Sequence, residues 1–248
     1  MPKMTGAQAL TKSLIDYSID TIFALPGAQL DPMFDALYDE KERIKVIHTR
    51  HEQGTSYMAF GYAQSTGRVG VNLVVPGPGL LNASAGLSTA FACGTKVLCL
   101  AGQIPSKLIG GGIGQLHELA DQPGAVASVT KWRGRAEHPE DAPERVREAF
   151  IQLNTGRAQP VLLEMAPDIM ATKADVTMLD TQSDYAKMDP APDPELIEKA
   201  AALLGSASNP AIIIGGGIWG AEDSLLALAE ELQAPVYTSP HGHGAIDS

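Results

Sequence analysis

The sequence predicts an α/β fold: a doubly wound parallel sheet followed by the beginning of a second, Rossmann-like α/β domain. Short apolar runs alternate with helical patterns from Thr21 to Met165, an order typical of parallel strands joined by helices. Val69–Val75 is an almost continuously apolar run, as expected for a strand buried on both faces of its sheet. Between Ala166 and Asp193 the chain is polar and contains prolines without periodicity, which is typical of an interdomain linker.

The first predicted domain comprises residues 1–170. Thr5 is placed to cap a helix that extends to about Tyr17. The strands expected here are Thr21–Leu25, Arg43–Ile47, Val69–Val75, Lys96–Ala101, Val126–Trp132 and Pro160–Met165. The remaining helices carry Met33–Tyr38, begin at Glu52, and cover Leu80–Cys93 and Pro139–Thr155.

The segment Ile104–Gly124 interrupts this alternation with a glycine-rich run, Ile109–Gln115. A loop of this length inside a compact α/β unit is usually functional or mobile. We therefore treat the residues that follow the run as candidates for the functional site.

A linker over residues 171–192 is predicted to lead into a second domain over residues 193–248. That domain is expected to contain helices at Pro194–Leu204 and Ala221–Leu232 and strands at Pro210–Ile214 and Pro235–Thr238. So few βα units are too small for an independent α/β core. We therefore expect the chain to stop inside its second domain.

Composition narrows the class of protein. Of the 248 residues, 44% are hydrophobic and 19% charged, and the formal net charge is −11; this excess of acid argues against nucleic acid or an anionic membrane as the main partner. No apolar run approaches the ~18 residues of a transmembrane helix. Cys93 and Cys99 lie in apolar surroundings, which favours free thiols and a cytoplasmic location.

The stretch His48–Gly54 carries the most informative carboxylate. Glu52 follows a predicted strand and begins a predicted helix, which places it at the carboxyl edge of the sheet, where α/β proteins bind ligands. A carboxylate stabilised by the helix dipole is the commoner explanation for an isolated acidic helix start. The residues that follow it in the chain favour a function.

The turn Pro76–Gly79 has two interpretations of equal weight. It could be purely structural, or it could bring backbone and a rigid proline ring against a flat ligand, with Asn82 facing the same pocket. Phosphate binding at this helix start is weakened because two prolines remove backbone N–H donors.

Two further patterns suggest a dinucleotide site and a metal site, but each lacks residues that such a site needs. Gly215–Gly220 fits the dinucleotide-binding fingerprint, but Thr238, Ser239 and Pro240 occupy the place of its acidic residue, so a tight turn is the better interpretation. His48 and His51 lack the further ligands of a metal site.

Taken together, the turns resemble the N-terminal pyrimidine-binding domain of thiamine-diphosphate enzymes of the acetolactate synthase-like family. The residues after Asp193 resemble the start of that family's central domain. The resemblance covers the whole chain in order and rests on several spaced pieces: Phe23–Gly27, Arg50–Gln53, Met58–Ala63, Gly77–Asn82, Gly102–Gln103, Thr130–Lys131 and Gly156–Val161.

The resemblance implies that Glu52 is the catalytic residue that hydrogen-bonds N1′ of the cofactor's aminopyrimidine and promotes loss of the proton from thiazolium C2. It also implies that Pro26, Gly27, Pro78 and Asn82 line the pyrimidine and substrate pocket. The cofactor's diphosphate would lie on a neighbouring subunit in a homodimer or homotetramer. Thiamine diphosphate is accordingly the expected cofactor, with a 2-keto acid such as pyruvate as substrate.

The chain departs from the family at the glycine-rich loop. Acetolactate synthases carry Phe-Gln-Glu where this chain has Leu116-His117-Glu118, so Gln115 and His117 are predicted substrate contacts that alter specificity. The family's third domain, with a Gly-Asp-Gly…Asn pattern that binds Mg²⁺ and diphosphate, has no match here. Mg²⁺ ligands are therefore expected outside this chain, and Arg157 is a possible FAD contact by resemblance.

The resemblance implies a decarboxylase that also ligates the two-carbon unit to an acceptor. The alternatives are a simple 2-keto acid decarboxylase or lyase and, from another class, a non-catalytic subunit that supplies only the pyrimidine half of a split site. A further alternative is a dinucleotide-binding module built on Gly215–Gly220, against which the missing acidic residue argues.

Overall fold

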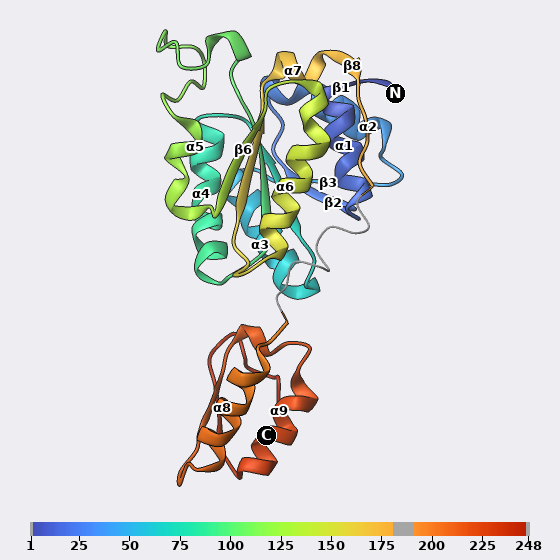
Figure 1. The fold of residues 1–248 in the computed structure, drawn as a ribbon. Helices are drawn as coiled ribbons and strands as arrows, with labels where there is room; N and C mark the ends of the chain where they lie inside the picture. Colours follow the sequence, from blue (N-terminus) through green and yellow to red (C-terminus); the bar gives the residue numbers. More distant parts are fainter. Residues whose placement is uncertain (1, 181–190, 247–248) are drawn as a thin grey trace. The chain divides into compact units, whose positions relative to one another are not determined.

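The computed structural model describes residues 2–180 and 191–246, which belong to two compact units, Met1–Asp189 and Pro190–Ser248 (Figure 1). In the described part of the first unit, six strands form one sheet in the order β3-β2-β4-β5-β7-β6, and every neighbouring pair is parallel. The strands are β2 (Thr21–Ala24), β3 (Lys45–His48), β4 (Gly70–Val74), β5 (Val97–Gly102), β6 (Trp132–Ala136) and β7 (Val161–Met165). The predicted doubly wound parallel sheet is confirmed.

Helices cover both faces of this sheet. One apolar core joins the sheet to α1 (Gly6–Asp16), α2 (Asp31–Asp39) and α6 (Ala142–Asn154). A second core on the other face joins it to α3 (Glu52–Thr66) and α4 (Pro78–Ala92), and α4 and α6 lie on opposite sides of the strands in Figure 1. Strands β4, β5 and β7 are buried along their whole length, which explains their largely apolar sequence.

The first helix begins as predicted at a Thr5 cap. The Thr5 hydroxyl accepts from the Gln8 N–H at 3.1 Å, and the Gln8 side chain accepts from the Thr5 N–H at 3.0 Å. This reciprocal pair satisfies two backbone donors that the first helical turn leaves free.

The predicted strand Val126–Trp132 is wrong. A short helix, α5 (Gln122–Ala125), ends just before this segment, and Ala127–Val129 within it form a 3₁₀ turn, η3. The strand β6 begins only at Trp132. Val126 and Val129 both pack on the core beside α4; their spacing of three residues is helical, whereas the sequence interpretation took their apolar character for a strand.

Two further boundaries differ from the prediction. Pro139–Asp141 forms a 3₁₀ turn (η4), and α6 starts after it at Ala142. The expected linker is structured in its first part: α7 (Pro167–Ala171) is followed by β8 (Lys173–Asp175), which pairs antiparallel with β1 (Lys3–Thr5). Backbone bonding to a distant polar strand explains why no apolar pattern revealed β8. Part of the expected linker, residues 181–190, lies outside the described residues.

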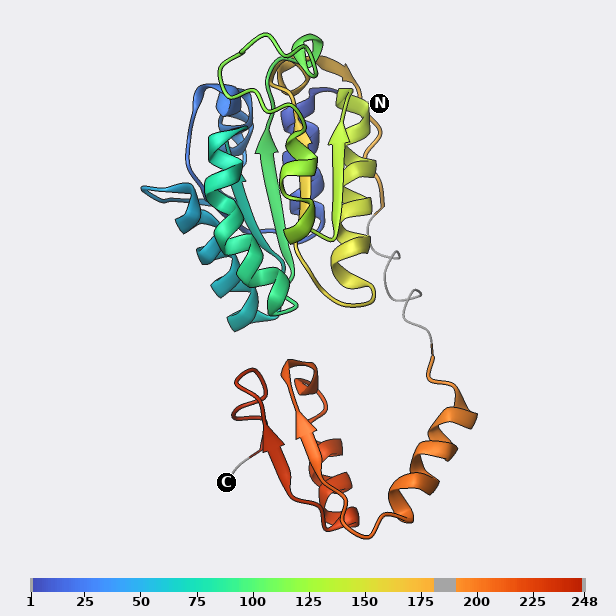
Figure 2. The same ribbon diagram turned by 90° about the vertical axis from the view of Figure 1, so that its left-hand side faces the viewer.

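The second unit contains α8 (Pro194–Gly205), β9 (Ile212–Ile214), a 3₁₀ turn η5 (Gly216–Ile218), α9 (Glu222–Leu232) and β10 (Val236–Thr238). β9 and β10 pair in parallel, and Figure 2 shows them side by side. The apolar cluster of this unit has three buried members, Ile214, Leu225 and Ala245, and α8 buries none of its residues. In the described part of the chain, the helices are too short or too polar to cross a membrane.

Cys99 provides a stability prediction. Burial raises the pKa of its thiol from 9.0 to about 12, with a smaller opposing effect from the Asn72 side chain. Because the folded state holds the neutral thiol, its contribution to stability is complete below about pH 9 and is lost as the pH rises towards 12.

We expect the free energy of unfolding to fall less steeply between pH 9 and 12 in Cys99→Ala than in the wild type, measured by urea unfolding. Cys93→Ala, which removes a partly exposed thiol, should retain the wild-type slope. Equal slopes in the wild type and Cys99→Ala would show that the buried thiol does not titrate with unfolding.

Candidate active site

The candidate site lies where the strand order of the sheet reverses. From β2 the chain crosses to β3 on one side, whereas β4 lies on the other side of β2 and leads on to β5. The turns after β2 and β4 therefore diverge at one edge, the position at which open α/β sheets bind ligands. These turns contact each other, because a Cβ added at Gly27 would overlap the Val75 side chain.

Glu52 stands at the start of α3, directly after the β3 turn. His51 caps this helix, since its Nδ1 accepts from the Gln53 N–H at 3.1 Å. The Thr49 hydroxyl donates to the His51 carbonyl at 2.8 Å and so ties the turn to the cap. The prediction of a carboxylate at a strand-to-helix junction is confirmed.

Asn82 and Glu52 meet between the starts of α3 and α4. The Asn82 Nδ2 donates to Glu52 Oε2 at 3.0 Å, which orients the carboxylate. Glu52 Oε1 has no hydrogen-bond partner among the described residues. Gly79 lies beside it, and a Cβ added there would be 3.5 Å from Oε1 and closer still to Val75. A half-buried carboxylate with one committed and one open oxygen is suited to share a proton with a ring nitrogen.

The other residues predicted for the pocket come from the same two turns. Pro26 is exposed and Gly27 partly buried after β2. Pro78 is the first residue of α4, where its missing N–H costs no helical hydrogen bond. Of the predicted pocket residues, Gly27 therefore contacts Val75 in the turn after β4, and Asn82 contacts Glu52.

The glycine-rich loop reaches the same edge of the sheet. Gly77 has φ 59° and ψ −115°, a conformation that strongly favours glycine, and a Cβ there would overlap the backbone carbonyl of His117. His117 itself has φ 69°, and its Nδ1 is buried without a hydrogen-bond partner. The predicted substrate residue His117 therefore lies against the turn that begins α4.

Glu118 organises the loop around Gln115. Its carboxylate accepts from the N–H groups of Gly112 at 2.8 Å, Gly114 at 2.8 Å and Gln115 at 2.9 Å. The Gln115 backbone bond holds the pKa of Glu118 below its usual value. Burial opposes this shift, and the backbone N–H groups of Gly112, Ile113 and Gly114 add to it. The loop has a defined shape because its own carboxylate satisfies its donors.

Sequence reasoning missed a buried polar network beneath this loop. Glu164, fully buried in β7, forms an ion pair with Arg135 of β6. Gln122 Nε2 donates to Glu164 Oε2 at 2.7 Å and to the Gly102 carbonyl at 2.9 Å, and Gln122 Oε1 accepts from the Gly77 N–H at 2.9 Å. An acid inside the apolar run Val161–Met165 was the available signal, since buried acids are rarely left unpaired.

Arg157 is not brought to this site. Its guanidinium donates to the Ala92 carbonyl at 3.2 Å, at the last residue of α4, whereas Asn82 lies near the first turn of that helix. At 1.5 Å per residue the intervening helix spans roughly 15 Å. Arg157 therefore lies at the opposite end of α4 from Glu52 and its neighbours.

Other parts of the first unit offer no competing metal centre. Among the described residues, no three His, Cys, Asp or Glu side chains are grouped to hold a metal ion.

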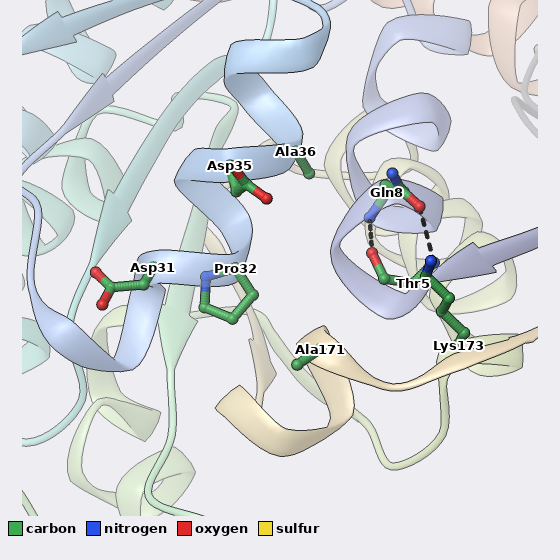
Figure 3. A pocket seen from close by; sticks show the side chains of 8 residues that line it. All are labelled: Thr5, Gln8, Asp31, Pro32, Asp35, Ala36, Ala171 and Lys173. Carbon is green, nitrogen blue, oxygen red and sulfur yellow. Dashed lines mark hydrogen bonds between the residues drawn. The ribbon is translucent and has the colours of Figure 1, made fainter.

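A cavity of about 540 Å³ lies between the start of α1, one side of α2 and the end of α7 (Figure 3). It contains no residue of the predicted site, and its lining carries both acidic and basic groups, Asp31, Asp35 and Lys173.

In the second unit, the turn Gly215–Gly220, which formally fits the dinucleotide-binding fingerprint and is predicted to be a tight turn, ends in a hydrogen bond to an acidic side chain. Both carboxylate oxygens of Glu222 accept from the Gly220 N–H, at 3.0 and 2.9 Å. An acidic group at this place disfavours a pyrophosphate, which agrees with a plain βα turn.

The comparisons with known proteins identify the family of this chain. Residues 4–125 match the family described as the thiamine pyrophosphate enzyme N-terminal TPP binding domain, and residues 197–248 match the thiamine pyrophosphate enzyme central domain. The chain belongs to the thiamine pyrophosphate enzyme family. Both family matches follow the order expected from the sequence resemblance.

Relatives within this family are similar along nearly the whole chain. A probable acetolactate synthase large subunit of Methanocaldococcus jannaschii is 37% identical over 97% of this chain, and the acetolactate synthase large subunit of Corynebacterium glutamicum is 34% identical over 96%. A probable 2-ketoarginine decarboxylase of Pseudomonas aeruginosa is 34% identical over 98%. The chain spans 41%, 38% and 43% of the lengths of these relatives, respectively.

The close packing of Gly77 gives a prediction for the turn beneath the site. Gly67, which ends α3, also has positive φ (70°), but a Cβ there would meet no atom within 4 Å. Gly67→Ala should therefore lower the free energy of unfolding by only about 1–2 kcal/mol, the cost of placing a residue with a Cβ in the left-handed conformation.

Gly77→Ala should cost clearly more, because its Cβ also displaces the His117 backbone. Chemical unfolding of both variants beside the wild type measures the difference. Equal losses at the two positions would mean that the loop does not pack on the turn in solution.

Proposed function

We propose that this chain supplies the pyrimidine-binding half of a thiamine-diphosphate site, in an enzyme that decarboxylates a 2-keto acid and ligates the two-carbon unit to an acceptor, as acetolactate synthases do. The observation that carries the proposal is the Glu52 carboxylate at the reversal point of the sheet. Asn82 orients this carboxylate at 3.0 Å, and its second oxygen remains open beside Gly79. The family match supplies the cofactor class.

The residues at this edge fit an aminopyrimidine. The open Glu52 oxygen would hold a proton at the ring nitrogen. Glycine at position 79 lets the start of α4 pack closely on Val75 beside the carboxylate. Gly27 and Pro78 would form walls of the pocket. Bound thiamine diphosphate supplies the carbanion chemistry and the electron sink for decarboxylation; the chain orients the ring and controls its proton.

A second candidate function is a decarboxylase or lyase without carboligation. It is favoured by the similarity to a probable 2-ketoarginine decarboxylase and by the His117 departure from the acetolactate synthase pattern. Gln115 and His117 would contact the substrate in either case, and pyruvate is the 2-keto acid that we propose. A non-catalytic subunit that contributes only Glu52 and its pocket remains the alternative from another class.

The remaining proposals concern the metal ion, the diphosphate, the oligomeric state and FAD. We propose that Mg²⁺ and the diphosphate are held by carboxylate and carbonyl oxygens outside this chain, and that the enzyme is a cytoplasmic homodimer or homotetramer. Exposed Tyr57 and Met58 on α3 and Leu81 on α4, each about 40% accessible, support a partner surface near the site. FAD remains a proposal for Arg157.

Glu52→Gln tests the proposed role of the carboxylate. The amide retains the shape of the side chain but cannot share a proton with the ring nitrogen, so we expect cofactor activation to fall by about 10²–10⁴-fold. The measurement is hydrogen–deuterium exchange at thiazolium C2 in the assembled holoenzyme.

Gln53→Glu is the matched control, because it changes a neighbouring side chain that is exposed. It should exchange at the wild-type rate. Unchanged exchange in Glu52→Gln would remove Glu52 from the mechanism.

His117→Gln tests the substrate assignment. Because His117 lies in the loop over the Gly77 turn, its replacement should change the ratio of kcat/KM values among 2-keto acids, which reports differential binding of their transition states. The C2 exchange rate should stay close to wild type. If kcat/KM falls by one common factor for every substrate, His117 does not determine specificity.

A further inference from the structure

Gln122 is a buried glutamine whose hydrogen bonds are all internal. It is 1% exposed, and each end of its amide is used: the oxygen accepts from the Gly77 N–H, and the nitrogen donates to the Gly102 carbonyl and to Glu164. Removing one member of such a buried set leaves the others unpaired, which costs more than the bond contributes. The side chain thus joins the loop end to the turn after β4, to the end of β5 and to β7.

The bond to Gly77 acts directly on the start of α4. Gly77 is the cap residue of that helix, and the backbone of His117 packs against its α-carbon. The turn is therefore held on two sides, by the Gln122 amide oxygen and by the loop. Since Asn82 lies one turn into α4 and donates to Glu52, the position of this helix start sets the orientation of the carboxylate.

Both ends of the glycine-rich loop attach to the same carboxylate oxygen. Gln103, which precedes the loop, donates to Glu164 Oε2 at 3.4 Å, and Gln122, which follows it, donates to the same atom at 2.7 Å. Arg135 compensates the buried charge. The base of the loop is thereby closed by one buried acid, but only the Gln122 end is bonded to Gly77.

We propose that Gln122 is a positioning residue for the reaction: it fixes the Gly77 turn, and through α4 and Asn82 it sets the productive orientation of the Glu52 carboxylate. The inference rests on the proposed function of Glu52. A carboxyl group that is displaced by a fraction of an ångström shares a proton with the ring nitrogen less efficiently, so the effect should appear in the proton-transfer step.

The test compares Gln122→Met with Gln103→Met in the assembled holoenzyme. Both replace a buried glutamine that reaches Glu164, but only the first releases the Gly77 N–H. We expect both variants to lower the melting temperature. C2 hydrogen–deuterium exchange and kcat should fall by about 10–100-fold in Gln122→Met, with little change in KM, and should stay near wild type in Gln103→Met.

Gln122→Glu provides a second variant that remains informative if Gln122→Met does not fold. It keeps an acceptor for the Gly77 N–H, and a proton shared with the neighbouring Glu164 would take the place of the amide donor. It should therefore exchange within a few-fold of wild type despite lower stability. Equal losses of exchange in Gln122→Glu and Glu52→Gln, or equal losses in Gln122→Met and Gln103→Met, would overturn the positioning role.

The outcomes also separate this inference from the proposed function. If Glu52→Gln abolishes exchange and Gln122→Met leaves it unchanged, the positioning role fails and the function stands. If Glu52→Gln itself leaves exchange unchanged, the proposed function fails, and with it the basis of this inference.

Discussion

The hydrogen bond between Asn82 and Glu52 is the contact on which the candidate site depends. It joins the first turns of α3 and α4, two helices that pack on the same face of the sheet. Their close approach is possible because Gly86 leaves no side chain between α4 and Ser56 of α3. One carboxylate oxygen is thereby committed, and the other is presented at the sheet edge where the crossover direction reverses.

A second constraint lies below the surface of that edge. A fully buried carboxylate, Glu164, interrupts the apolar β7, and the structure compensates it with Arg135, Gln122 and Gln103. Replacing such a network by apolar residues is often neutral for stability, so stability alone does not explain it. Its geometry supports the two ends of the loop, whose glycine-rich part is bonded to its own Glu118 and whose Ser106 is bonded to Asp168.

The sequence predicted the sheet well because strands buried on both faces leave continuous apolar runs, as in Val69–Val75. It also located Glu52 and Asn82 through their place at helix starts and through the family resemblance. It failed where structure depends on distant backbone or side-chain partners: β8 is polar and exists by pairing with β1, and Val126 with Val129 occupy one face of a turn. The bond of Gln122 to Gly77 joins residues 45 positions apart, which no local pattern encodes.

The central claim is that the open oxygen of Glu52 meets the pyrimidine ring nitrogen of bound thiamine diphosphate. The most direct measurement is the distance between these two atoms in an experimental structure of the assembled holoenzyme. The account predicts a hydrogen-bond distance of about 2.5–3.0 Å, with Asn82 still bonded to the other carboxylate oxygen. A separation greater than about 3.6 Å, or a ring bound at another edge of the sheet, would contradict it.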